Sequence, residues 1–161
     1  MKNKKEFAPI KSGFTLIELL VVISIIGILA ALATVSFTST QKQARDTQRK
    51  SDLRQYQSAL EVQANKNNGF YISYPAGTTM KILCSGLELS NCPEDPKYST
   101  YRYHYVSDGS SNFTATQYVL WATLENVTST NWVVCSSGVS GKISSVGFSG
   151  NGGVCPDGLQ P

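Results

Sequence analysis

The chain has 161 residues and a formal net charge of +3 at pH 7, with a single histidine. That positive surplus lies entirely in residues 1–13, and basic and acidic residues balance over the rest of the chain. The charged residues of the first segment are Lys2, Lys4, Lys5, Lys11 and Glu6. The overall charge therefore describes the first residues and gives no indication of a nucleic-acid partner for the remainder.

An apolar run of 19 residues extends from Phe14 to Leu32, and Glu18 is its only charged residue. As a helix at about 1.5 Å per residue, this run measures about 30 Å, which is enough to cross a bilayer. A carboxylate in a membrane-embedded helix costs about 2 to 3 kcal/mol unless something neutralises it. Glu18 is therefore a candidate functional residue, and we expect an amine to be its partner.

A family resemblance rests on the segment Lys11 to Glu18, which reads Lys-Ser-Gly-Phe-Thr-Leu-Ile-Glu. It resembles the class III signal of type IV pilins and type II secretion pseudopilins, in which a membrane prepilin peptidase cuts after the glycine and methylates the new terminal phenylalanine. The resemblance implies cleavage between Gly13 and Phe14, N-methylation of Phe14, and pairing of Glu18 with the terminal amine of a neighbouring subunit during filament assembly. An α-amine with a pKa of about 8 stays charged near neutral pH, so this pairing is physically reasonable.

The same resemblance implies three domains, a location and a set of partners. The expected divisions are a leader peptide at 1–13, a transmembrane and polymerisation helix at 14–34, and an extracytoplasmic globular pilin domain at 35–161. The chain would cross the cytoplasmic membrane once with its globular domain outside, and later belong to a cell-surface or periplasmic filament. Its partners would be the prepilin peptidase, an inner-membrane assembly platform, the membrane before assembly, other pilins and further copies of itself. Because the cleavage site precedes the apolar run, the helix is expected to stay attached.

Helical patterning continues beyond the apolar run. No proline occurs between Pro9 and Pro75, and Leu53, Tyr56 and Leu60 form an apolar stripe at i, i+3, i+7 spacing. Asn65 to Gly69 supplies a helix-stopping cluster. A helix is therefore predicted over 14 to about 66, with Gly27 as its weak point.

The basic run from Lys42 to Arg54 is interrupted by Asp46 and Asp52. Asp46 is predicted to pair with Lys50 at i, i+4. The interrupted run favours a solvated or subunit-facing helix surface over a nucleic-acid patch.

After Pro75 the composition changes to Ser, Thr, Gly, Asn and Tyr, with short strand-like runs. The predicted strands are Tyr101–Val106, Tyr118–Leu124, Trp132–Cys135 and Lys142–Phe148. The alternating tyrosines of the first run are expected to form one packed face of the sheet. The long helix and this antiparallel sheet would cover each other, giving an α+β pilin fold.

Pro93-Glu94-Asp95-Pro96 and Tyr101-Arg102-Tyr103 resemble the Asp-Pro loop and tyrosine strand of major pseudopilins, although Lys97-Tyr98 replaces the usual Trp-Gly pair. Many major pseudopilins also bind calcium in a C-terminal loop. Here residues 148–161 offer only Asp157 and Asn151 among glycines. Calcium prefers six to eight oxygen ligands. The sequence therefore favours a plain glycine-rich loop, and no cofactor is predicted.

Four cysteines lie in the part expected outside the membrane, which indicates an oxidising compartment. They are Cys84, Cys92, Cys135 and Cys155. Three pairings are possible, and the sequence-local one, Cys84 with Cys92 and Cys135 with Cys155, is favoured because it closes short loops. A zinc site is disfavoured, because zinc sites usually use cysteines separated by two residues.

Evidence for catalysis is thin. His104 is the only histidine and no nucleophile with a base can be built around it from sequence. The sequence thus favours a structural subunit of a type IV pilus or type II secretion pseudopilus. The alternatives are a minor pilin at a filament tip that binds DNA or a surface, and, far behind, a membrane enzyme.

Overall fold

This computed structural model describes residues 13–161, without the side chains of residues 33–36. Residues 1–12 of the expected leader lie outside the described residues. The chain forms two compact units, one up to Ser39 and one from Thr40 to Pro161. The boundary between the two units lies inside the long helix, after residue 34. Residue 34 is the predicted end of the membrane segment, and that end stays a prediction.

The predicted helix is confirmed as α1, Leu16–Lys66. It ends where the sequence indicates, because Asn68 and Gly69 both have positive φ, 57° and 85°. The Gly69 N–H donates to the Ala64 carbonyl at 2.8 Å, a bond across five residues that is typical of a helix stop built on a left-handed glycine.

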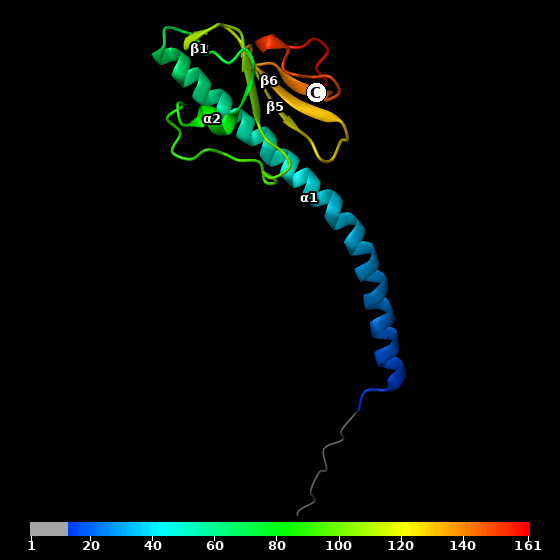
Figure 1. Cartoon of the computed structure of the whole chain (residues 1–161). Helices are drawn as coiled ribbons and strands as arrows, with labels where there is room; N and C mark the ends of the chain where they lie inside the picture. The colour runs from blue at the N-terminus through cyan, green and yellow to red at the C-terminus, as the bar shows by residue number, and fades with distance from the viewer. Residues whose placement is uncertain (1–12) are drawn as a thin grey trace, which may run out of the picture. The chain divides into compact units, whose positions relative to one another are not determined.

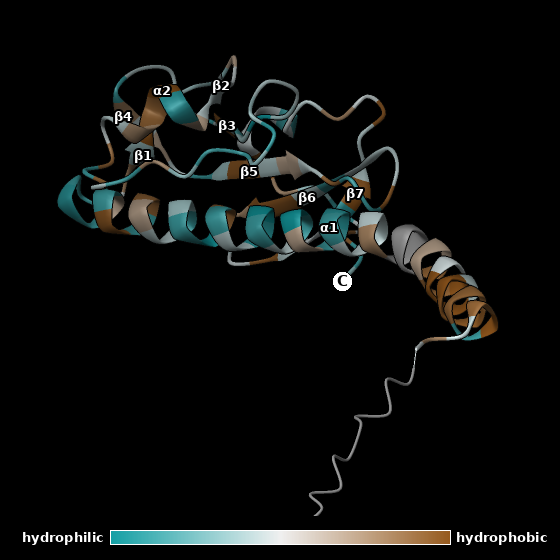
Figure 2. Ribbon diagram, turned by 90° about the horizontal axis from the view of Figure 1, so that it is seen from below, coloured by the Kyte–Doolittle hydropathy of each residue, from teal (hydrophilic) through white to brown (hydrophobic). Residues whose placement is uncertain are grey.

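The surface of α1 changes along its length. Figure 2 shows hydrophobic residues in its N-terminal turns and mostly hydrophilic ones in the turns beside the sheet. In the second half, Leu53, Tyr56 and Leu60 are at most 1% exposed, which confirms the predicted stripe. This stripe packs on the sheet, beside β5 and β6 in Figure 1.

The sheet has five antiparallel strands in the order β2-β3-β5-β6-β7, and β1 and β4 form a separate pair. The strands are β1 Tyr71–Ile72, β2 Thr78–Thr79, β3 His104–Ser107, β4 Phe113–Ala115, β5 Tyr118–Thr123, β6 Thr130–Cys135 and β7 Ser140–Ser144. A short helix α2, Met80–Cys84, follows β2, and a 3-10 turn η1, Asn151–Gly153, lies near the C-terminus. The predicted α+β class, a long helix on an antiparallel sheet, is confirmed.

All four predicted strands have different bounds in the structure. Two differ by only one or two residues at one end, since β5 ends at Thr123 and β6 begins at Thr130. The first and last predicted strands differ more. The first begins at His104 rather than Tyr101, because the Tyr101 N–H closes a turn onto the Lys97 carbonyl. The last is Ser140–Ser144 rather than Lys142–Phe148. The chain turns after β7, because Gly147 has a φ of 72° and the Phe148 N–H donates to the Ser145 carbonyl. Within the predicted tyrosine face, Tyr103 and Tyr105 are buried in the core, whereas Tyr101 is only half-buried.

The C-terminal loop covers the sheet face that α1 leaves open. Val106, Val119 and Val133 form a second apolar cluster there, and Phe148 and Leu159 pack on it. Gly150 lies so close to Val106 and Trp121 that a Cβ atom would collide with both, and its φ is 84°. Glycine is therefore required for the loop to lie flat on the sheet.

Both disulfides are present in the structure, in the sequence-local pairing. Cys84 pairs with Cys92 and Cys135 with Cys155, and the described residues contain no free cysteine. The first bond closes the segment after α2. The second joins β6 to the C-terminal loop.

A buried guanidinium connects α1 to two loops. Arg49 is fully buried, which corrects the expectation that the whole basic run forms a solvated or subunit-facing surface. Its Nε and Nη2 donate to the two carboxylate oxygens of Asp95 at 2.6 and 2.9 Å. Nη2 also donates to Glu125 at 2.6 Å, and Nη1 donates to Asp46 at 2.8 Å. The Tyr101 ring lies 4.8 Å from the guanidinium carbon.

The predicted Asp46–Lys50 pair is wrong. Asp46 accepts from Arg49 and from the backbone N–H groups of Glu125 and Asn126, at 2.8 Å in each case. The Arg45 guanidinium, together with Lys97 and Arg49, holds the pKa of the Glu125 carboxyl well below its usual range. Asp46, Asp95 and Glu125 are thus balanced by Arg45, Arg49 and Lys97, and the cluster has no net charge.

Replacing Arg49 by Met should destabilise the folded protein by about 3 to 5 kcal/mol, because Asp95 would stay buried without its cation. The matched control is Arg54→Met on the same helix, since Arg54 is exposed and forms no ion pair within residues 13–161. Chemical unfolding of the full chain in detergent would measure both variants. Equal unfolding midpoints for the two would contradict a stabilising role for the cluster.

The purified protein should contain two disulfides and no alkylatable thiol. Non-reducing peptide mapping by mass spectrometry should recover the pairs Cys84–Cys92 and Cys135–Cys155, and replacing both cysteines of either pair by serine should cost about 2 to 3 kcal/mol of stability. A cross-paired peptide, or a native subunit that reacts with alkylating reagent, would count against this arrangement.

Candidate functional site

The start of α1 is organised by Thr15 and Glu18. The Thr15 backbone N–H and hydroxyl both donate to Glu18 Oε2 at 2.8 Å. The Glu18 N–H returns a bond to the Thr15 hydroxyl at 3.3 Å. This reciprocal arrangement is a capping box, which satisfies N–H groups that a helix start leaves free.

This cap is not among the features predicted from the sequence, although the Thr-x-x-Glu spacing before an apolar run is its usual signal. The cap uses one carboxylate oxygen. Glu18 Oε1 accepts no hydrogen bond from the residues that the structure describes. It can therefore accept a donor from another molecule while Oε2 keeps the cap.

Apolar side chains surround this carboxylate. A concave surface of about 360 Å³ is lined by Phe14, Ile17, Val21 and Val22, and Glu18 supplies its only charge. Phe14, next to the expected cleavage site at Gly13, is 87% exposed. Glu18 thus lies within the apolar surface of α1, four residues after Phe14.

The first half of α1 leaves its apolar side chains exposed in every direction. The exposed large residues of this half are Leu16, Ile17, Leu19, Leu20, Val21, Val22, Ile23, Ile25, Ile26, Ile28, Leu29, Leu32 and Phe37. Among the described residues, α1 is the one helix whose length and composition would allow it to cross a membrane. A helix that is apolar all round requires an apolar environment, either lipid or other helices.

The single histidine of the sequence lies on β3 of the globular unit. His104 stacks on Trp121 with ring centroids 5.1 Å apart, and burial lowers the pKa of its imidazole. Within residues 13–161 no group of three or more His, Cys, Asp or Glu side chains is arranged to hold a metal ion. Asp157 of the glycine-rich loop is exposed.

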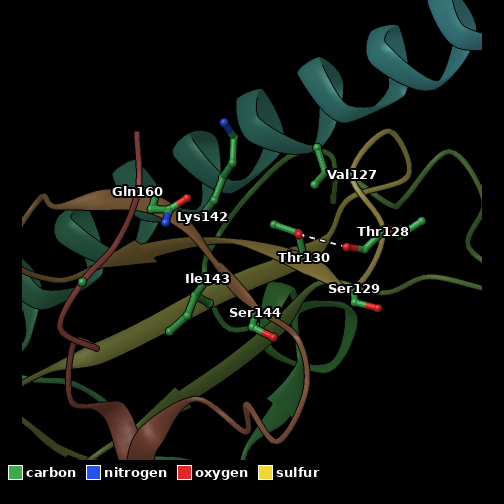
Figure 3. A pocket seen from close by; sticks show the side chains of 9 residues that line it. Val127, Thr128, Ser129, Thr130, Lys142, Ile143, Ser144 and Gln160 are labelled. Atoms are coloured by element: carbon green, nitrogen blue, oxygen red, sulfur yellow. Dashed lines mark hydrogen bonds between the residues drawn. The ribbon is translucent and has the colours of Figure 1, made fainter.

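A groove of about 470 Å³ lies at the β7 edge of the sheet (Figure 3). It is lined by Val127, Thr128, Ser129, Thr130, Lys142, Ile143, Ser144, Gly158 and Gln160. The Thr130 hydroxyl donates to the Thr128 carbonyl at 3.1 Å, and Lys142 extends toward α1. Lys142 is the only charged residue in this lining.

Comparison with known proteins identifies the N-terminal segment. Residues 10–34 match the family model described as the prokaryotic N-terminal methylation motif. This match contains Gly13, Phe14 and Glu18, the residues that the sequence analysis singled out. No solved structure matches the chain.

Two curated relatives extend the comparison. The chain is 41% identical over 103 residues to the type II secretion system core protein G of Pseudomonas aeruginosa, which covers 58% of this chain and 72% of that protein. It is 46% identical over 48 residues to the type IV major pilin protein PilA of Myxococcus xanthus, covering 30% of this chain but only 22% of that pilin. Taken with the N-terminal motif and the fold, these similarities show that the chain belongs to the family of type IV pilins and type II secretion pseudopilins.

Proposed function

We propose that this protein is a structural subunit that polymerises through its N-terminal helix into a type IV pilus or a type II secretion pseudopilus. Family membership supports a structural role in such a filament, and the family is not one of enzymes. The observation that carries the proposal is the first half of α1, a continuous apolar surface with one carboxylate near its start.

Before assembly, the apolar half of α1 would lie in the membrane, with the globular unit outside the cytoplasm. In the filament, the same half would lie among the helices of other subunits. Both environments exclude water, so both satisfy the apolar side chains. They differ at Glu18, because headgroups and water remain close to a helix end in the bilayer but not in a packed bundle.

Glu18 would then accept the terminal amine of a neighbouring subunit. A prepilin peptidase would create that amine by cleaving between Gly13 and Phe14 and would methylate it. Oε1 of Glu18, which accepts no hydrogen bond within residues 13–161, is the acceptor available for this contact. Assembly would need an inner-membrane platform and further pilins, as the family resemblance implies.

The mature chain should begin at N-methylated Phe14. Gly13→Val should leave the precursor uncut in the membrane, because a branched side chain replaces the smallest residue at the cleavage site. Intact-mass measurement on purified filaments gives the first residue and its methyl group directly. Filament subunits that retain residues 1–13 would contradict this processing.

Removing the Glu18 carboxylate should prevent assembly without preventing processing. Glu18→Ala should be cleaved and inserted normally but assemble poorly, because an unpaired buried amine costs about 3 to 5 kcal/mol. Glu18→Asp, with a shorter reach, should keep partial assembly. For each variant, the measurement compares processed subunit in membranes with subunit in sheared filaments.

The matched control is Glu18→Gln. Glutamine also serves in a capping box, so this variant keeps the cap to Thr15 and removes only the charge. It should assemble as poorly as Glu18→Ala. A normal filament yield from Glu18→Gln would show that Glu18 acts only as a helix cap, and a normal yield from Glu18→Ala would remove Glu18 from assembly altogether.

A further inference from the structure

The sequence contains two Asn-Gly pairs, Asn68-Gly69 after the end of α1 and Asn151-Gly152 in η1. In such a pair the backbone nitrogen of the glycine can attack the side-chain amide carbon of the asparagine, because glycine has no side chain to hinder the approach. Ammonia leaves and a succinimide ring forms. Water then opens the ring to give aspartate or isoaspartate, in which the backbone runs through the side-chain carbon. Both pairs are therefore candidate sites of deamidation.

The two asparagines have closely similar local environments. Both are exposed, and both lie in the left-handed region, with a φ of 57° for Asn68 and 55° for Asn151. Neither side-chain amide forms a hydrogen bond within residues 13–161. A difference in their reactivity must therefore come from the peptide group that supplies the attacking nitrogen.

The nitrogen of Gly69 is engaged in a hydrogen bond, whereas that of Gly152 is not. The Gly69 N–H donates to the Ala64 carbonyl at 2.8 Å, so attack by this nitrogen would have to break the end of α1. The Gly152 N–H has no acceptor among the residues that the structure describes. Its peptide group is held through the Asn151 carbonyl, which accepts from the Val154 N–H at 3.2 Å. The attacking nitrogen is thus available in η1 and committed at the end of α1.

The residues on either side of the exposed pair in η1 contact the sheet closely. Gly150 lies against Trp121 of β5, and Gly153 lies against Ser107 of β3, so that a Cβ atom on either glycine would collide with the sheet. The Gly153 N–H donates to the Gly150 carbonyl at 3.0 Å and closes the turn. The Asn-Gly pair is therefore the tip of a tight turn whose two ends both rest on the sheet.

We propose that Asn151 is a site of spontaneous deamidation in the folded protein, and that its isoaspartate product loosens the C-terminal loop. A bond forms between Gly152 N and Asn151 Cγ as the Cγ–Nδ2 bond breaks and ammonia leaves. Water then breaks one of the two carbonyl bonds to the ring nitrogen, and nothing is oxidised or reduced. The reaction needs water alone as co-reactant and leaves a new carboxylate.

Isoaspartate lengthens the backbone between Gly150 and Gly153 by a carbon atom. The turn can then no longer keep both of its contacts with the sheet unchanged. Because Cys155 stays bonded to Cys135 of β6, the loop is loosened rather than released. This inference goes beyond the proposed filament function and does not depend on it.

Ageing of the full chain in detergent tests the site. In mildly alkaline buffer, which favours loss of the amide proton, Asn151 should deamidate about tenfold faster than Asn68, the factor that one hydrogen bond of ordinary strength gives. Peptide mapping with fragmentation locates the mass increase that replaces an amide by a carboxylate. In denaturant the two pairs should react at similar rates, because both glycine nitrogens are then open to water.

Asn151→Gln is the matched variant. Its longer side chain closes a ring of the required kind far less readily, so the mass increase should disappear from the loop and remain unchanged at Asn68. Equal rates at the two asparagines in the folded protein would overturn the site. So would an Asn151 that reacts in denaturant but not in the folded chain.

The effect on the loop is measured on aged protein that has been separated by charge. It should contain isoaspartate at residue 151, and the Gly153 and Val154 amides, which donate within the turn, should exchange hydrogen faster than in fresh protein. Aspartate as the sole product, or unchanged hydrogen exchange in the isoaspartate form, would overturn the loosening of the loop.

Discussion

The surface of α1 is the constraint on which the rest of the structure depends. A single helix from Leu16 to Lys66 carries an apolar surface all round at its start and a narrow apolar stripe near its end. The stripe is satisfied within the chain, because the sheet covers Leu53, Tyr56 and Leu60. Within the described residues of its own unit, the large apolar side chains of the first half have no such cover. Its burial, worth about 1.5 to 3 kcal/mol for each large side chain, is available only from lipid or from other helices.

The cluster around Arg49 explains how the globular unit holds its loops against α1. Hydrophobic contacts hold the sheet on the stripe. Charge-assisted hydrogen bonds with defined geometry join α1 to the loops that contain Asp95 and Glu125. The desolvation cost of burying Arg49 is offset by three carboxylates at 2.6 to 2.9 Å. Such a cluster contributes more to the position of the loops than to net stability.

Much of the fold could be predicted because its signals are periodic or local. The stripe at Leu53, Tyr56 and Leu60 repeats with the helix, and Asn68-Gly69 marks a stop that only left-handed residues can make. The burial and ion pairs of Arg49 could not be predicted, because Asp46 is at helical spacing from both Arg49 and Lys50. Which of the two pairs with Asp46 depends on Asp95 and Glu125, which are far away in the sequence. Strands β1 and β2 have two residues each, too few to show alternation. Their pairing depends on neighbours far away in the sequence.

The capping box gives Glu18 two compatible roles rather than two competing ones. Thr15 holds the carboxylate at the start of the helix through Oε2, in the separate subunit, before any partner arrives. The side-chain entropy lost in fixing a glutamate, which can reach about 1.5 to 2 kcal/mol, is then lost on helix formation rather than on assembly. In the proposed contact, an incoming amine would meet a carboxylate that is already oriented, whose Oε1 accepts no hydrogen bond within residues 13–161. The local cap thus favours the contact between subunits that the proposed filament needs.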